Sequence, residues 1–383
     1  MPNELTPNLV VAALGIFLVG LAVCSRVFST PPAILISGAK VLVPLLYFAF
    51  FFDGSWTLVD DWIYFENGQD LLKEGYDPFT ILFDGESLLY LLAMSAGHHV
   101  LYNWYNLFAQ WLFGEYYYSA VFLNVGLTFG AGLLLYRLAL VSKFPKSYAR
   151  GLFLFFLLHW ELLAWSSVVN LKDTLVLLMT VALMYAGMRL AQTRKIVYAV
   201  SVVGLVFLFY WIRFYVPFTL LLSALLYLLL LRGGNGRVGL IIIVGGMVAG
   251  YSYFVGWGEV HEGFGTLNVG FGALAGAAKM MITPRPWAIS TDYSFLLLPS
   301  ILNWMFFFPT LVGTTMLWRD APHLRAMLIY LLAALLFYGA FEELLGPRQR
   351  FQLLFIYAWA QFHFAWYLLR TGRQKYSALQ GIA

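Results

Sequence analysis

The sequence predicts an all-α protein, a polytopic transmembrane helical bundle, and three observations support that class. Apolar residues make up 61% of the 383 residues and charged residues only 11%, whereas an ordinary soluble domain has roughly 25% charged residues. Uncharged runs such as 214–231 and 238–255 are long enough to cross a hydrocarbon core about 30 Å thick. The basic residues fall mostly in short segments between apolar runs. The chain is therefore expected to be a multi-pass membrane protein with no nucleic-acid partner.

Hydropathy predicts about eleven spans. They lie near 8–23, 32–52, 117–136, 151–168, 173–189, 196–212, 216–231, 238–256, 297–317, 326–343 and 351–369. The stretch 88–113 is apolar but broken by polar residues, and it is rich in Trp and Tyr. It is expected to form one or two amphipathic helices along the membrane surface, with a re-entrant pair as the alternative.

The basic residues also predict the orientation of the chain. Alternate loops contain Arg26; Arg137, Lys143, Lys146 and Arg150; Arg189, Arg194 and Lys195; Arg232 and Arg237; Arg319 and Arg325; and Arg370, Arg373 and Lys375. Cytoplasmic loops are enriched in lysine and arginine. These loops are therefore expected to be cytoplasmic, with the amino terminus outside, the carboxyl terminus inside and the active face outside. A bacterial cytoplasmic (inner) membrane is the expected location.

Two predicted external loops are long enough to carry chemistry. The first covers 53–116, and the second, 257–296, is rich in glycine, which is typical of a mobile lid. The predicted cytoplasmic segments are all short, and the sequence contains no phosphate-binding loop of the Walker type. Residues 1–383 are therefore expected to form a single transmembrane domain without an ATP-binding module.

The densest group of acidic residues follows the second predicted span and includes the adjacent pair Asp60 and Asp61. A carboxylate held near the membrane interface can take a proton from an acceptor hydroxyl. A second one can orient the acceptor or hold a divalent cation, Mg²⁺ or Mn²⁺. The alternative is a solvated acidic loop without a catalytic role. No cofactor is required by either interpretation.

Four basic residues occur where a predicted span meets the outside: Lys172, Arg213, Arg348 and Arg350. Arginine grips phosphate with paired hydrogen bonds and lysine binds it as a point charge. Because a lipid phosphate lies at this depth, these residues are expected to hold a donor phosphate. The alternative is that they anchor the chain at the interface or pair with nearby acids. The nearest such acids are Asp173, Glu342 and Glu343.

No metal site is predicted. The pairs His98-His99 and His261-Glu262 contain ligand types, but neither supplies three ligands at a spacing known for zinc.

Several segments resemble the GT-C superfamily of membrane glycosyltransferases, which use sugars linked to polyprenyl phosphate. The resemblance is carried by 60–65 (DDWIYF) and 71–79 (LLKEGYDPF), where an acidic pair, a helix and a Gly-x-Asp-Pro turn follow an early span. It continues over 113–139 and 164–174, which ends in a basic-acidic pair, and over 346–351 (GPRQRF). The chain departs from the family in having two predicted spans, not one, before the acidic pair.

The resemblance implies a reaction. A sugar would pass, with inversion, from a polyprenyl-phosphate donor to a glycan, lipid or protein acceptor on the non-cytoplasmic face. Asp60 or Asp61 would act as the base, and Lys172, Arg213, Arg348 and Arg350 would hold the leaving phosphate. Such a reaction belongs to the assembly of cell-envelope polysaccharides.

Three other interpretations stay open. A repeat-unit polymerase or ligase would move an oligosaccharide from a lipid diphosphate and would also pair external arginines with acids. A transporter or lipid flippase would place charged residues in the middle of several spans. Here the deep charged or titratable residues are Lys40, His159, Glu161 and His363. An inactive scaffold of an envelope-assembly complex is the third alternative.

Overall fold

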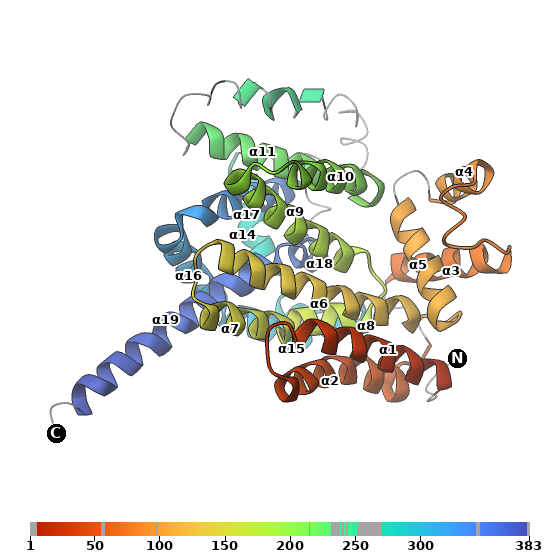
Figure 1. Cartoon of the computed structure of the whole chain (residues 1–383), viewed down its shortest axis with the longest axis horizontal. Coiled ribbons are helices and arrows are strands. Elements are labelled where there is room, and N and C mark those ends of the chain that lie inside the picture. The colour runs from red at the N-terminus through yellow and green to blue at the C-terminus, as the bar shows by residue number, and fades with distance from the viewer. Residues whose placement is uncertain are drawn as a thin grey trace. The chain divides into compact units, whose positions relative to one another are not determined.

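The computed structural model describes residues 6–54, 58–95, 99–213, 215–230, 238, 241–242, 244–247, 249–250, 270–341 and 345–380. Over these residues the chain is all-helical, without strands (Figure 1). The α-helices are α1 Pro7–Cys24, α2 Thr30–Leu46, α3 Val59–Lys73, α4 Gly85–Met94, α5 Val100–Phe113, α6 Tyr118–Val141, α7 Lys146–Leu157, α8 Trp160–Val168, α9 Asp173–Thr193, α10 Ile196–Arg213, α11 Tyr215–Leu230, α14 Phe271–Ile282, α15 Leu297–Met305, α16 Phe307–Asp320, α17 Arg325–Ala340, α18 Pro347–Phe351 and α19 Leu354–Gln380. A π-helical turn, η1 (Tyr47–Phe51), extends α2, and the 3₁₀ turns are η2 Pro286–Ala288, η3 Thr291–Leu296 and η4 Pro322–Leu324.

Six helical segments of the described chain are long and apolar enough to cross a membrane. They are Pro7–Cys24, Thr30–Phe51, Tyr118–Val141, Asp173–Thr193, Ile196–Arg213 and Pro322–Ala340. Two helix pairs, each bent at a short break, raise the number to eight if each pair is one span: Lys146–Leu157 with Trp160–Val168, and Tyr293–Met305 with Phe307–Asp320. The chain is therefore a membrane-embedded helical protein.

The prediction of eleven spans is matched only in part. The span expected at 216–231 corresponds to α11, an apolar helix shorter than a full span, and most of the span expected at 238–256 lies outside the described residues. The span expected at 351–369 corresponds to α19, which is not among the candidate spans. The stretch 88–113 forms two helices, α4 and α5.

By its internal contacts the described chain divides into two compact units. Unit 1 consists of residues 1–138, 157–217 and 288–299, and unit 2 of residues 139–156, 218–287 and 300–383. Each is described below by itself.

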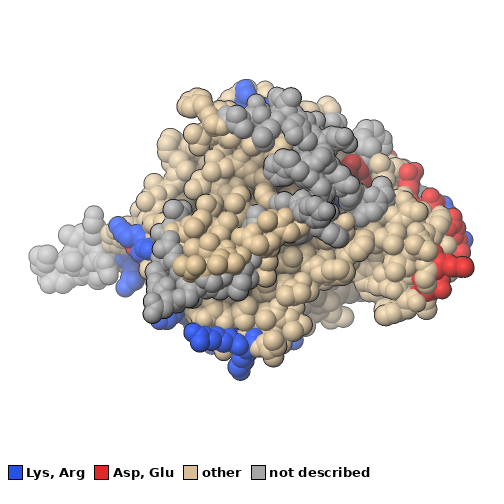
Figure 2. All heavy atoms as spheres, turned by 90° about the horizontal axis from the view of Figure 1, so that it is seen from above, with Lys and Arg blue, Asp and Glu red and all other residues tan. Residues whose placement is uncertain are grey.

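Unit 1 contains the helical pair α1 and α2 and the first predicted external loop. In that loop α3 packs against α5 around five buried aliphatic residues, Leu71, Ile81, Leu91, Val100 and Leu107. Except for the buried Asp61, the described acids of this loop are exposed or half-buried, and Figure 2 shows Asp and Glu gathered over this part of unit 1. The aliphatic core therefore fixes the position of α3, whose first turn carries Asp60 and Asp61.

Unit 2 is held together by close helix contacts. The backbones of α14 and α17 meet at Gly276 and Gly339, where a Cβ on Gly276 would lie 2.1 Å from the carbonyl oxygen of Gly339. Only glycine allows this approach. The second loop was predicted to cover 257–296; its residues 257–269 lie outside the described chain, while residues 271–282 form α14 and pack against α17.

Candidate functional site

The acidic pair begins α3, and its two members have different surroundings. Asp61 is fully buried. Its Oδ1 accepts a hydrogen bond of 3.1 Å from the backbone N–H of Leu58, and its Oδ2 accepts one of 2.6 Å from the hydroxyl of Tyr117. Burial and the neighbouring Asp61 raise the pKa of Tyr117 well above its usual value, so the hydroxyl keeps its proton and donates it. Asp60, one residue earlier, is only half-buried.

Asn170 connects the acidic pair to the start of α9. It lies in the short extended segment between α8 and α9, and its side chain is fully buried. Its backbone N–H donates to the Tyr117 hydroxyl over 3.2 Å, and its side-chain amide donates to the backbone carbonyl of Asp61 over 3.3 Å and to Asn106 Oδ1 over 2.7 Å. Its Oδ1 accepts from the Tyr102 hydroxyl at 2.8 Å. The backbone N–H and side-chain amide of Asn170, which lie outside any helix, thereby find hydrogen-bond partners inside an apolar protein.

Lys172 ends this segment and caps α9. Its side chain is 5% exposed, and its Nζ lies 2.6 Å from Nδ1 of His99 and 5.6 Å from the centre of the Tyr64 ring. A lysine ammonium group can only donate hydrogen bonds, so Nδ1 of His99 is the acceptor in this contact. The structure therefore brings a cation and a titratable ring together two residues from Asn170.

Asp173 and Arg213 form a buried ion pair in unit 1. Asp173 is the first residue of α9 and Arg213 the last of α10, and their Oδ1 and Nη1 atoms are 2.8 Å apart. The two side chains are 1% and 5% exposed. The pair fastens the ends of two neighbouring helices, in agreement with the alternative that pairs these basic residues with acids.

Arg348 and Arg350 belong to unit 2, where both lie on the short helix α18. Nη1 of Arg350 donates to the backbone carbonyl oxygens of Met281, at 3.3 Å, and of Thr283. These carbonyls end α14, and a cation there satisfies groups that no helical N–H reaches. Arg348 is half-buried. The acids Glu342 and Glu343 lie outside the described residues.

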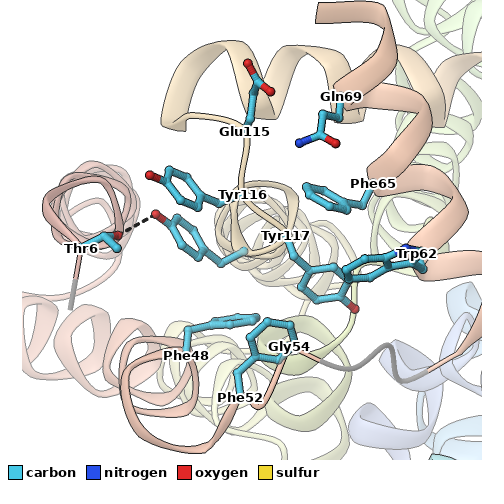
Figure 3. Close-up of a pocket in the computed structure, with 11 residues that line it drawn as sticks. Thr6, Phe48, Phe52, Gly54, Trp62, Phe65, Gln69, Glu115, Tyr116 and Tyr117 are labelled. Carbon is cyan, nitrogen blue, oxygen red and sulfur yellow. Dashed lines mark hydrogen bonds between the residues drawn. The ribbon is translucent and has the colours of Figure 1, made fainter. Parts of the chain in front are cut away.

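A pocket of about 300 Å³ opens beside the acidic pair (Figure 3). Its lining consists of Thr6, Phe48, Phe52, Gly54, Trp62, Phe65, Gln69, Glu115, Tyr116, Tyr117 and Tyr118, all from unit 1. Tyr117 both lines the pocket and donates to Asp61. Tyr117 therefore connects the wall of the pocket to Asp61.

Three features of this site were not predicted from the sequence. Asn170 was not singled out, although a polar Asn-Leu-Lys-Asp run between two apolar helices is a usable signal for a buried break. Tyr117 belongs to the run Glu115-Tyr116-Tyr117-Tyr118, which resembles an interfacial aromatic belt. His99 had been considered only as a metal ligand. Among the described residues no group of three or more His, Cys, Asp or Glu side chains could hold a metal ion.

Comparison with known protein families, with curated proteins and with solved structures gave no match.

Proposed function

We propose that this chain is a membrane glycosyltransferase that moves a sugar from a polyprenyl-phosphate donor to an acceptor hydroxyl on the non-cytoplasmic face. The observation that carries the proposal is the arrangement in unit 1. A half-buried carboxylate, Asp60, lies beside a fixed one, Asp61, and hydrogen bonds through Tyr117 and Asn170 lead to the segment that ends in the buried cation Lys172. Base and phosphate ligand are the two groups that this transfer requires.

Asp60 is the proposed base. Both carboxylate oxygens of Asp61 already accept hydrogen bonds inside the protein, so Asp61 acts as a positioning residue for the first turn of α3. Asp60 takes the proton as the acceptor oxygen bonds to the anomeric carbon. The bond from that carbon to the phosphate oxygen breaks, and polyprenyl phosphate leaves with the electron pair. One displacement inverts the anomeric centre and needs no covalent intermediate.

Lys172 is the proposed ligand of the leaving phosphate. Its ammonium group has three N–H donors, one of which is directed to His99, and a positive charge in a water-poor site stabilises developing negative charge strongly. Arg213 is assigned a supporting role, because its guanidinium holds Asp173 at the start of α9. In unit 2 Arg350 supports the end of α14.

The test uses Asp60→Asn in protein reconstituted into lipid bilayers with labelled polyprenyl-phosphate sugars. Release of polyprenyl phosphate should fall at least about a hundredfold, because asparagine cannot accept the proton, while donor binding stays unchanged. Asp70→Asn is the matched control, an exposed aspartate on the same helix, and should turn over donor like the parent. Parental turnover in Asp60→Asn would refute the assignment. Movement of intact donor across the bilayer without any phosphate release would indicate a transporter.

A further inference from the structure

The aromatic pocket of unit 1 is separate from the proposed donor contacts and has no assigned ligand. It takes three residues from one face of α3, because Trp62, Phe65 and Gln69 are spaced three and four positions apart. The other wall comes from the run 115–118 before and into α6. The proposed base Asp60 thus precedes, on the same helix, the residues that line this pocket.

The pocket has an apolar side and a polar side. Figure 3 shows Phe48 and Phe52 on one side and Gln69 on the opposite side, with the Gln69 amide directed toward the space between the rings and the Glu115 carboxylate directed away from it. A volume of about 300 Å³ is at the lower end of the range of roughly 300–1,000 Å³ typical of small-molecule sites. The space therefore suits one small ring and is too small for a long polyprenyl chain.

We propose that this pocket binds a pyranose ring, the sugar that carries the acceptor hydroxyl. A pyranose has apolar C–H faces, which pack against aromatic rings, and an edge of hydroxyls that both donate and accept hydrogen bonds. Gln69 matches that edge because a carboxamide offers both donors and acceptors. An ammonium ligand would use only the acceptors. Aromatic walls with a few placed polar groups are the usual construction of a ligand site.

This inference rests on the proposed function and narrows it to a glycan or glycolipid acceptor. Tyr117 connects the two parts, since its ring lines the pocket and its hydroxyl donates to Asp61. A sugar bound against Tyr117 therefore lies next to the first turn of α3.

The binding experiment is saturation-transfer NMR on the full chain in lipid nanodiscs. The probes are methyl α-glucopyranoside, methyl α-mannopyranoside and methyl α-galactopyranoside, with choline as the cationic comparison. Ring protons of at least one glycoside should be saturated. The glycoside Kd from a titration of this signal should rise about tenfold, equivalent to roughly 1.4 kcal/mol, in both Tyr116→Ala and Gln69→Leu. Trp287→Ala removes an aromatic side chain that is 69% exposed in unit 2 and should leave the signal unchanged.

Three results would overturn the inference. They are the absence of saturation for every glycoside, equal signals in the parent and in both pocket variants, or a choline signal that replaces the glycoside signals and is lost in the variants. Failure of the proposed function looks different. A parent that binds glycoside through Gln69 and Tyr116 but releases no polyprenyl phosphate has a sugar site without the transferase activity. If the parent transfers sugar and Gln69→Leu has the same KM for the acceptor as the parent, the protein is a transferase that does not use this pocket.

Discussion

The start of α9 in unit 1 and the end of α14 in unit 2 each receive a buried arginine, and the two arginines meet different partners. Arg213, 5% exposed, contacts the carboxylate of Asp173 at 2.8 Å. Arg350, 4% exposed, donates to main-chain carbonyls. Both occur at a junction between apolar sequence and a predicted external face, so they look alike in the sequence. The two arginines differ in what remains when each is removed. Without Arg213 a buried carboxylate loses its cation, whereas without Arg350 neutral main-chain carbonyls lose a donor.

The largest effect is expected for Arg213→Ala. The substitution leaves the Asp173 carboxylate, 1% exposed, buried without this cation, and breaking one side of a buried ion pair costs about 3–5 kcal/mol. Equilibrium unfolding in mixed detergent micelles should show that loss. The double variant Arg213→Ala with Asp173→Ala should recover most of it, because the buried carboxylate is removed together with its partner. A double variant as unstable as the single one would mean that the ion pair is not the source of the effect.

A smaller loss is expected for Arg350→Ala. The change leaves the carbonyls of Met281 and Thr283 without a charged donor, and hydrogen bonds to charged groups contribute about 1.5–3 kcal/mol. Water reaching the end of α14 replaces part of that contribution. Under the same unfolding conditions Arg350→Ala should therefore lie between the parent and Arg213→Ala. If Arg350→Ala lowers stability more than Arg213→Ala does, the contacts of Arg350 with α14 do not explain its whole effect. The donor-phosphate role predicted from the sequence would then be supported for Arg350.

The sequence predicts the membrane helices and the acidic start of α3 for clear physical reasons. Long apolar runs have few alternatives to a span, and an acidic pair is favourable in the first turn of a helix. It does not predict which acid is buried, because Asp60 and Asp61 differ only by about 100° around the helix. That rotation matters only once Tyr117, 56 positions away from Asp61 in the chain, is in place.

Local breaks inside a predicted span escape hydropathy for a related reason. A hydropathy window averages over about 19 residues and does not register the helix break at Leu158–His159 between α7 and α8. The buried asparagines are a second example. Asn106, Asn124 and Asn170 look like loop or interface residues, yet all three are fully buried and hydrogen-bonded to one another or to Tyr102 and Tyr105. Only the three-dimensional arrangement supplies their partners.

Lys40 extends the comparison to a buried cation with neither kind of partner. It lies within the candidate span Thr30–Phe51 and is fully buried. Its Nζ has no hydrogen-bond partner among the residues that the structure describes, and it interacts electrostatically with the buried thiol of Cys24. Burial of an unpaired ammonium group is unfavourable. Replacement by an apolar side chain of similar length therefore removes a cost and breaks no hydrogen bond.

Lys40→Met should accordingly stabilise the protein, by about 1 kcal/mol or more, the opposite sign from both arginine substitutions. Ser37→Ala is the matched control, because Ser37 is equally buried on the same helix and carries no charge; its effect on unfolding should be small. A destabilised Lys40→Met would show that the ammonium group has a partner in the folded protein, such as a lipid or substrate anion. Loss of donor turnover in a stabilised Lys40→Met would show that the Lys40 ammonium group takes part in the reaction, and unchanged turnover would leave Lys40 outside it.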